Sequence, residues 1–115
     1  MVDDEEGILR TFRRILEPPY DVTTASSAAD AIAAMDAYPT FDAIVCDVRM
    51  PSMTGPMLHA AILERHPPLA TRFVFVTATP PDGELICGAR VLAKPVSRRD
   101  LLDAVEGIVQ ATASH

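Results

Sequence analysis

Three short runs of apolar residues, at positions 43–46, 73–76 and 91–93, most constrain what this chain can fold into. Each run is unbroken, whereas a strand with one solvent-exposed face alternates apolar and polar residues. Unbroken runs of this length are typical of parallel strands covered on both faces. Because the residues between the runs have helical spacing, the pattern predicts an α/β domain with a parallel sheet and right-handed crossovers.

The helical segments have recognisable starts. Apolar residues recur with helical spacing in residues 8–16. A short β-prone segment follows at residues 20–24, and the serines at positions 26–27 can cap a second helix. Gly55 opens a third helix, and residues 97–100 form a capping box before the last one. Strand and helix therefore alternate along the chain.

Length and composition narrow the class of protein. The chain has 115 residues, the usual size of one domain, so we expect residues 1–115 to form a single domain. The net charge of −6 argues against direct nucleic-acid binding. No apolar run approaches the roughly 20 residues needed to cross a membrane, and the acidic N-terminus does not resemble a signal peptide. We therefore expect a cytoplasmic protein, with Cys46 and Cys87 reduced and buried among apolar neighbours.

Five polar residues follow predicted strands at the points where these end. Asp3 and Asp4 follow the first strand position, Asp47 follows the run at 43–46, and Thr77 and Lys94 follow the next two runs. The carboxyl ends of parallel strands meet at one edge of a sheet, where the chemistry of such folds gathers. Three carboxylates, a hydroxyl and an ammonium are thus predicted to converge.

Such a group is suited to phosphoryl transfer. Clustered carboxylates repel one another unless a cation lies between them, and an all-oxygen site suits Mg²⁺. Asp47 could then act as a nucleophile and form an aspartyl phosphate. Lys94 and Thr77 could hold the other phosphoryl oxygens.

At this point the sequence resembles the receiver domains of two-component response regulators, the CheY-like family. Four motifs carry the resemblance in order: an acidic opening, a phosphoacceptor loop of the form Asp-x-x-Met-Pro-x-x-x-Gly, a hydroxyl followed by a small residue, and a lysine followed by proline. In this sequence they are Asp3-Asp4, the loop from Asp47 to Gly55, Thr77-Ala78 and Lys94-Pro95.

The resemblance implies a fold and a metal site. The fold would be flavodoxin-like and doubly wound, with a five-stranded parallel sheet in the order 2-1-3-4-5. Asp4 and Asp47 would bind Mg²⁺ directly, Asp3 mainly through water, and the backbone carbonyl of Arg49 would be a further ligand. The family also implies a cis peptide bond before Pro95.

The resemblance also implies a function. Asp47 would take a phosphoryl group from a histidine kinase or a histidine phosphotransfer protein. Thr77, Lys94 and the backbone N–H of Ala78 would bind that group. The chain would be a signalling module and not an enzyme beyond its own phosphorylation and dephosphorylation. It would act through contacts with an unknown downstream protein, with homodimer formation as a further possibility.

Three features depart from the family pattern. Only Met1 and Val2 precede the acidic pair where the family has a full first strand, so we expect a truncated strand or a natural start further upstream. The stretch between Thr77 and Lys94 is short, so the fourth helix should be abbreviated, with residues 79–87 a loop of at most about two helical turns. Val91 stands where the family usually has an aromatic switch residue.

Two other functions fit part of the pattern. A degenerate receiver that only binds a partner would account for the truncated first strand. A phosphatase of the haloacid-dehalogenase type also uses an aspartate nucleophile with Mg²⁺. That family, however, places a second aspartate two residues after the nucleophile, where this chain has Arg49.

Overall fold

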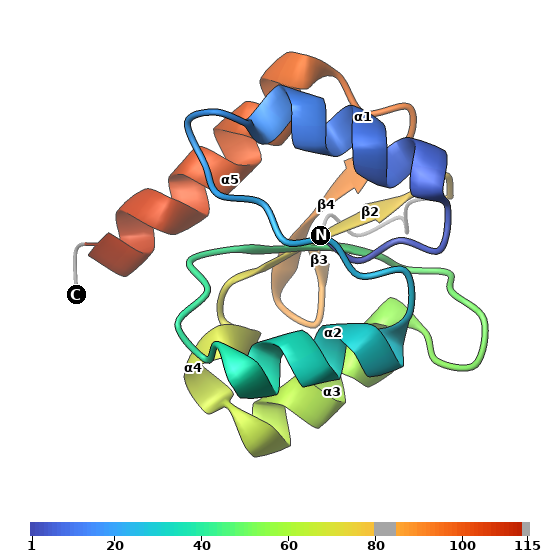
Figure 1. The fold of residues 1–115 in the computed structure, drawn as a ribbon, viewed down its shortest axis with the longest axis vertical. Coiled ribbons are helices and arrows are strands. Elements are labelled where there is room, and N and C mark those ends of the chain that lie inside the picture. The colour runs from blue at the N-terminus through green and yellow to red at the C-terminus, as the bar shows by residue number, and fades with distance from the viewer. Residues whose placement is uncertain (80–84, 114–115) are drawn as a thin grey trace.

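A computed structural model describes residues 1–79 and 85–113. A sheet lies between two layers of helices (Figure 1). One layer holds α1 (Glu6–Leu16) and α5 (Arg98–Ala113), and the other holds α2 (Ala28–Ala37), α3 (Gly55–Arg65) and the short α4 (Pro67–Ala70). The doubly wound α/β architecture predicted from the sequence is therefore confirmed.

The sheet has four strands within the described residues, in the order β1-β2-β4-β3. They are β1 (Ile44–Asp47), β2 (Phe73–Thr77), β3 (Leu85–Ile86) and β4 (Ala89–Ala93). β1, β2 and β4 pair in parallel and correspond to the three apolar runs, whereas β3 pairs antiparallel with β4 at the edge.

The first two strands of the expected five are reduced to single bridges. Val2 forms parallel bridges with Ala25 on one side and Cys46 on the other. The order 2-1-3-4-5 is thus preserved, but the five full strands are not. The cause is the length of the apolar segment, because only two residues precede the acidic pair. The expected truncation of the first strand is confirmed.

The core is divided by the sheet into two clusters. Every residue of β1 and β2 is buried, as expected for strands covered on both faces. Phe75 and Leu58 are fully buried on the side of α2 and α3. Val74 and Leu101 are fully buried on the side of α1 and α5.

The segment between β2 and β4, expected to be a loop with at most about two helical turns, is described only in part. Residues 80–84 lie outside the described residues, and the part that is described forms the β3–β4 hairpin. Cys87 and Gly88 form its turn, with positive φ angles of 53° and 75°. Cys87 is exposed, so its predicted burial was wrong, whereas Cys46 is buried as predicted. Apolar neighbours indicated burial, but in a hairpin turn they do not determine it.

The predicted helix starts are confirmed by their caps. The Ser27 hydroxyl accepts a hydrogen bond from the Asp30 N–H, and the Ser97 hydroxyl accepts one from the Asp100 N–H. Thr54 caps α3 in the same way, by accepting from the Met57 N–H. Each cap satisfies a backbone donor that the first turn of a helix leaves free. Within the part of the chain that the structure describes, no helix combines the length and apolar character needed to span a membrane.

Candidate acidic phosphoacceptor site

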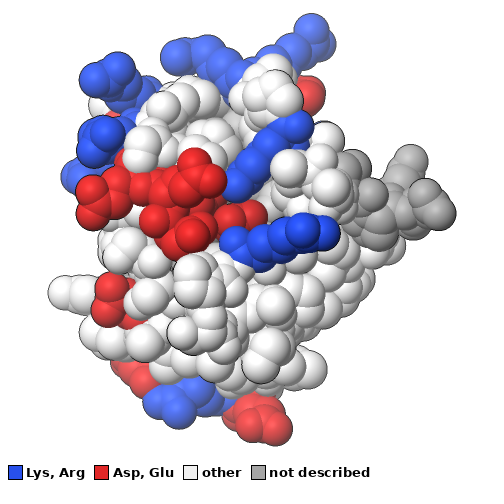
Figure 2. Space-filling view, turned by 90° about the vertical axis from the view of Figure 1, so that its right-hand side faces the viewer, with Lys and Arg blue, Asp and Glu red and all other residues white. Residues whose placement is uncertain are grey.

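The polar residues singled out in the sequence lie at one edge of the sheet. Asp47 is the last residue of β1, Thr77 is the last residue of β2, and Lys94 directly follows β4. Asp3 and Asp4 lie between the bridged Val2 and the start of α1. The three strands run in parallel, so their carboxyl ends share this edge. Figure 2 shows acidic side chains gathered on one face, with basic side chains beside them.

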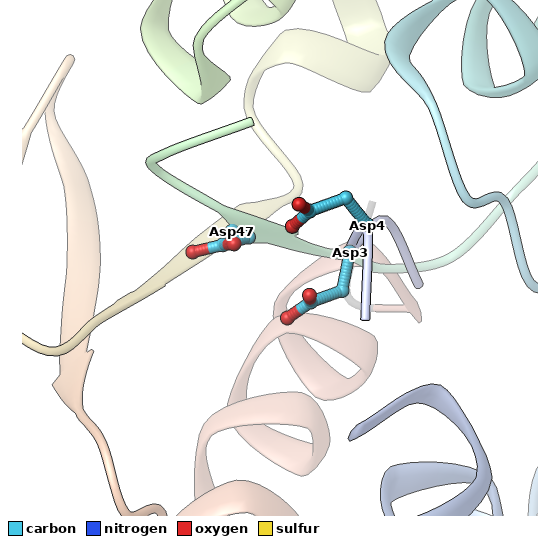
Figure 3. A group of neighbouring side chains, drawn as sticks. All are labelled: Asp3, Asp4 and Asp47. Atoms are coloured by element: carbon cyan, nitrogen blue, oxygen red, sulfur yellow. The ribbon is translucent and has the colours of Figure 1, made fainter. Parts of the chain in front are cut away.

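Three carboxylates form the centre of the site. Asp3, Asp4 and Asp47 each offer a carboxylate oxygen within 4.8 Å of the others (Figure 3). Asp3 and Asp47 are buried, whereas Asp4 is exposed. The predicted convergence of these three residues is therefore present in the structure.

Lys94 contacts the two buried carboxylates. Its Nζ lies 3.2 Å from Asp3 Oδ2 and 3.4 Å from Asp47 Oδ1. The side chains of all three residues are largely shielded from water, which strengthens the interaction over that of an exposed pair. One ammonium faces three carboxylates, so the group keeps a negative charge.

The pKa values of Asp47 and Lys94 are both raised, which has opposite effects on the charge of the two groups. Burial and then repulsion from Asp3 raise the pKa of Asp47, while Lys94 and the Arg49 backbone oppose this rise. Burial by itself would lower the pKa of Lys94, but hydrogen bonding and attraction from Asp3 and Asp47 outweigh it and raise that pKa. Lys94 therefore stays charged, and Asp47 carries an energetic cost when it ionises without a further cation nearby.

This set of donors fits a hard divalent cation. All of the offered atoms are carboxylate oxygens, and the exposed Asp4 leaves the site open to water. Mg²⁺ prefers oxygen ligands from one or two carboxylates and keeps several waters. Arg49, whose carbonyl is a predicted ligand, is exposed in the loop that follows β1.

The strand ends beside the carboxylates are joined by backbone hydrogen bonds. The Lys94 N–H donates to the Thr77 carbonyl at 2.8 Å, which links the ends of β2 and β4. Thr77 is buried, and its hydroxyl accepts a hydrogen bond from the Thr79 N–H. Ala78, the predicted backbone donor, is exposed directly after β2. The peptide bond between Lys94 and Pro95 is cis, as the resemblance implies.

Gly55 allows the start of α3 to pack closely against the end of β1, which its place in the motif alone does not indicate. A Cβ atom at this position would lie 2.5 Å from the Asp47 carbonyl oxygen and 3.1 Å from the Val48 Cα. The Gly55 N–H also donates to the Val48 carbonyl at 2.8 Å. The start of α3 therefore packs directly against the backbone that carries Asp47, which only a residue without a side chain permits.

The fold and the site together define a class of protein. It is a doubly wound α/β domain with a cluster of carboxylates, suited to a metal ion, at the carboxyl edge of its sheet. The family model of the response regulator receiver domain matches residues 1–106. The response regulator receiver protein CpdR of Brucella abortus is 30% identical over 115 residues, which are 96% of this chain and 95% of that protein. The chain therefore belongs to the response regulator receiver domains of two-component signalling.

Solved structures agree with this assignment. A receiver domain protein from Clostridium thermocellum has a TM-score of 0.86 at 26% identity, over 97% of this chain and 93% of that one. A CheY-like receiver domain protein from Methanospirillum hungatei has a TM-score of 0.85 at 27% identity, over 98% of this chain and 93% of that one.

Other relatives are longer proteins. The hydrogenase transcriptional regulatory protein HoxA of Cupriavidus necator is 30% identical over 96% of this chain, but the match covers 24% of its own length. Across three transcriptional regulators of this kind the chain spans between 19% and 26% of their length. Receiver domains are generally signalling domains without enzymatic activity, interact with histidine kinases and bind Mg²⁺ at an acidic pocket, so the phosphatase alternative has no support.

Lys94 and Asp47 are expected to be energetically coupled. Lys94→Met leaves two buried carboxylates without their cation, which should lower the free energy of unfolding of the metal-free protein by about 2 kcal/mol. In the Asp47→Asn background the loss should be smaller, since one of the two charges is already absent. Urea denaturation of the four proteins of this cycle measures the coupling. Strictly additive losses would show that the two side chains do not interact in solution.

Proposed function

We propose that this chain is a phosphoacceptor module that takes a phosphoryl group on Asp47 from a phosphohistidine donor. The observation that carries the proposal is the gathering of Asp3, Asp4 and Asp47 within 4.8 Å, with Lys94 paired to two of them. A carboxylate nucleophile beside a cation site and an ammonium is the arrangement that formation of an aspartyl phosphate uses.

In the proposed reaction an Asp47 carboxylate oxygen attacks the phosphorus of the donor. The O–P bond forms while the P–N bond to the donor imidazole breaks, and the departing nitrogen takes up a proton. Mg²⁺, when bound, would neutralise charge on the transferring oxygens. Asp4 and Asp47 would hold it directly, with Asp3 acting through water and Arg49 through its carbonyl.

The residues around Asp47 have separate tasks in this proposal. Lys94, already 3.4 Å from Asp47 Oδ1, would exchange part of its contact with the carboxylate for a phosphoryl oxygen. The Thr77 hydroxyl can donate to a second oxygen while it still accepts from the Thr79 N–H. The Ala78 N–H would serve as a further donor.

Output would come from protein contacts with a downstream partner or with a second copy of the chain. Val91 in β4 is β-branched and stiff, so it cannot supply the ring movement of the usual aromatic switch. We infer that phosphorylation acts on the segment after Thr77 directly. Residues 80–84 of that segment lie outside the described residues. The family and the composition support a cytoplasmic protein that binds neither nucleic acid nor membranes directly.

A direct test is incubation with a small-molecule phosphodonor and Mg²⁺, followed by intact-mass measurement. One added phosphoryl group is expected on the wild type and none on Asp47→Asn, and omission of Mg²⁺ should greatly slow the reaction. A properly folded wild type that gains no mass under any of these conditions would support the degenerate receiver, which only binds a partner.

A further inference from the structure

A groove of about 550 Å³ lies at the amino end of the parallel strands. Phe73 and Ala89, the first residues of β2 and β4, line it together with one face of α5. In Figure 1 α5 runs back along the sheet towards the C-terminus. Asp47, Thr77 and Lys94 lie at the opposite, carboxyl end of the strands. The groove is therefore separate from the candidate phosphoacceptor site.

Gly107 in α5 leaves this groove open. The first turns of α5 fill the space above the sheet with Leu101 and Val105, which are both buried. Further along the helix Gly107 and Ile108 line the groove, and nothing lies within 4 Å of a Cβ atom added at Gly107. The later turns of α5 therefore leave room for the side chains of another molecule.

Two arginines line the groove on the side of the sheet, Arg72 directly before β2 and Arg90 in β4. Successive side chains of a strand point to opposite faces, so Arg72 shares a face with Val74. Arg90 shares a face with Leu92 for the same reason. Val74 and Leu92 are both buried in the cluster that α5 covers. This face of the sheet is thus apolar beneath the first turns of α5 and cationic beside the groove.

Neither arginine is paired with a carboxylate of the described residues. One nitrogen of Arg72 donates to the Phe41 carbonyl at 2.7 Å, which anchors this half-buried side chain and leaves further N–H donors for a second acceptor. Arg90 is exposed, and its side chain makes no ion pair or hydrogen bond with the described part of the chain. The chain has 16 acidic and 10 basic residues, yet none of the described residues that line the groove is acidic. The groove is therefore complementary to a ligand that carries negative charge.

The spacing of the two arginines suits a short acidic peptide. Arg90 pairs with Val74 in the neighbouring parallel strand, so Arg72 lies one strand across and two residues back. With strands about 4.8 Å apart and a rise of about 3.3 Å per residue, the two Cα atoms are roughly 8 Å apart. Two residues separated by one other residue in an extended peptide are roughly 7 Å apart and point to the same side. A nucleic acid carries a charge at every repeat, which the net charge of −6 repels, and this favours the peptide.

We propose that this groove binds an extended segment of a partner protein in which two acidic residues flank one apolar residue. The two carboxylates pair with Arg72 and Arg90 on the side of the sheet. The apolar side chain between them points the other way and packs against Gly107 and Ile108 of α5. The contact attaches a partner at the end of the domain opposite to Asp47, and it does not depend on the function proposed for that residue.

The test uses the peptide Ser-Glu-Leu-Glu-Ser, acetylated and amidated at its ends, titrated into the full chain and followed by backbone amide shifts. We expect saturable shifts at Arg90 and Gly107, and affinity about tenfold weaker when both Glu residues of the peptide are replaced by Gln. Added salt should weaken binding of the acidic peptide, because the pairs are partly exposed. No saturation at millimolar peptide, or equal affinity of the two peptides, would overturn the proposal.

Three variants locate the peptide. Gly107→Phe should fill the groove and weaken binding at least tenfold, since there is space for the new side chain. Arg90→Gln removes one exposed ion pair and should weaken binding about threefold. Arg14→Gln removes the same charge from an exposed position of α1 outside the groove, so it should bind as the wild type does.

The same variants exclude other occupants of the groove. Equal binding of the peptide by all three variants would place it elsewhere and overturn the proposal. A single-stranded oligonucleotide that displaces the peptide at equal concentration would make a nucleic acid the better ligand. A dimer of the chain that dissociates when the peptide is added would make a second copy the occupant. Either result would also overturn the proposal, whereas a monomer that prefers the acidic peptide would support it.

Discussion

Replacing Asp47 with asparagine should abolish phosphorylation and, at the same time, raise the free energy of unfolding of the metal-free protein by on the order of 1 kcal/mol. Asp47 is buried beside Asp3, and the Lys94 ammonium, which contacts both carboxylates, offsets part of their repulsion. The amide keeps the shape of the side chain and removes its charge. Chemical denaturation without metal measures the gain, and intact mass after treatment with a phosphodonor measures the loss of phosphorylation.

This gain should depend on pH in a defined direction. The pKa of Asp47 is raised above 3.8 in the folded protein, so the folded state keeps this proton after the unfolded chain has lost it. The contribution of Asp47 to stability therefore falls as pH rises from near 3.8 through the folded pKa. The advantage of Asp47→Asn should be absent below this window and complete above it. An advantage that is constant with pH would show that charge is not its cause.

Mg²⁺ supplies the control for the same pair of proteins. A ligand that binds only the folded state stabilises it according to its concentration and affinity. Mg²⁺ should therefore raise the melting temperature of the wild type more than that of Asp47→Asn. An equal shift in both would mean that Asp47 is not part of the metal site.

Gly55→Ala should lower the free energy of unfolding by about 2–3 kcal/mol, as overpacking in a dense interior does. The new Cβ would meet the Asp47 carbonyl oxygen at 2.5 Å, so either α3 or the end of β1 must move. Because that movement displaces Asp47, the proposed phosphoacceptor, phosphorylation should also slow. Denaturation curves and the initial rate of mass gain measure the two effects.

Gly107 in α5 provides the matched substitution. Nothing lies within 4 Å of a Cβ added there, so Gly107→Ala should stabilise the protein by up to about 1 kcal/mol through helix propensity alone. Phosphorylation should be unaffected, since α5 begins beyond Lys94. If Gly55→Ala behaved like Gly107→Ala, the close approach of α3 to Asp47 would not limit the site.

The parts of the fold that follow from local chemistry were predictable from the sequence. The unbroken apolar runs identified β1, β2 and β4, and the hydroxyl residues that cap α2 and α5 fixed their starts. The position of Asp47 after such a run placed it at the carboxyl edge of the sheet. Its convergence with Asp3 and Asp4 followed from the parallel order of the strands.

The remaining features depend on contacts that a linear pattern does not encode. The β3–β4 hairpin and the exposure of Cys87 depend on two positive φ angles in a short turn. The clearance at Gly55 and the double contact of Lys94 are distances between elements far apart in the chain.

If the cation binds as proposed, the short ladder through Val2 makes its affinity a measure of local fraying of the N-terminal segment. Asp3 and Asp4 are attached to the sheet through the bridges of Val2 and the bond from the Asp3 N–H to the Ala25 carbonyl. In the proposed metal site, opening of these few bonds would carry Asp3 and Asp4 away together while β1 keeps Asp47 in place. The apparent dissociation constant then equals the intrinsic one divided by the closed fraction. Amide exchange at Val2 and Asp3 and cation titration should consequently report the same equilibrium.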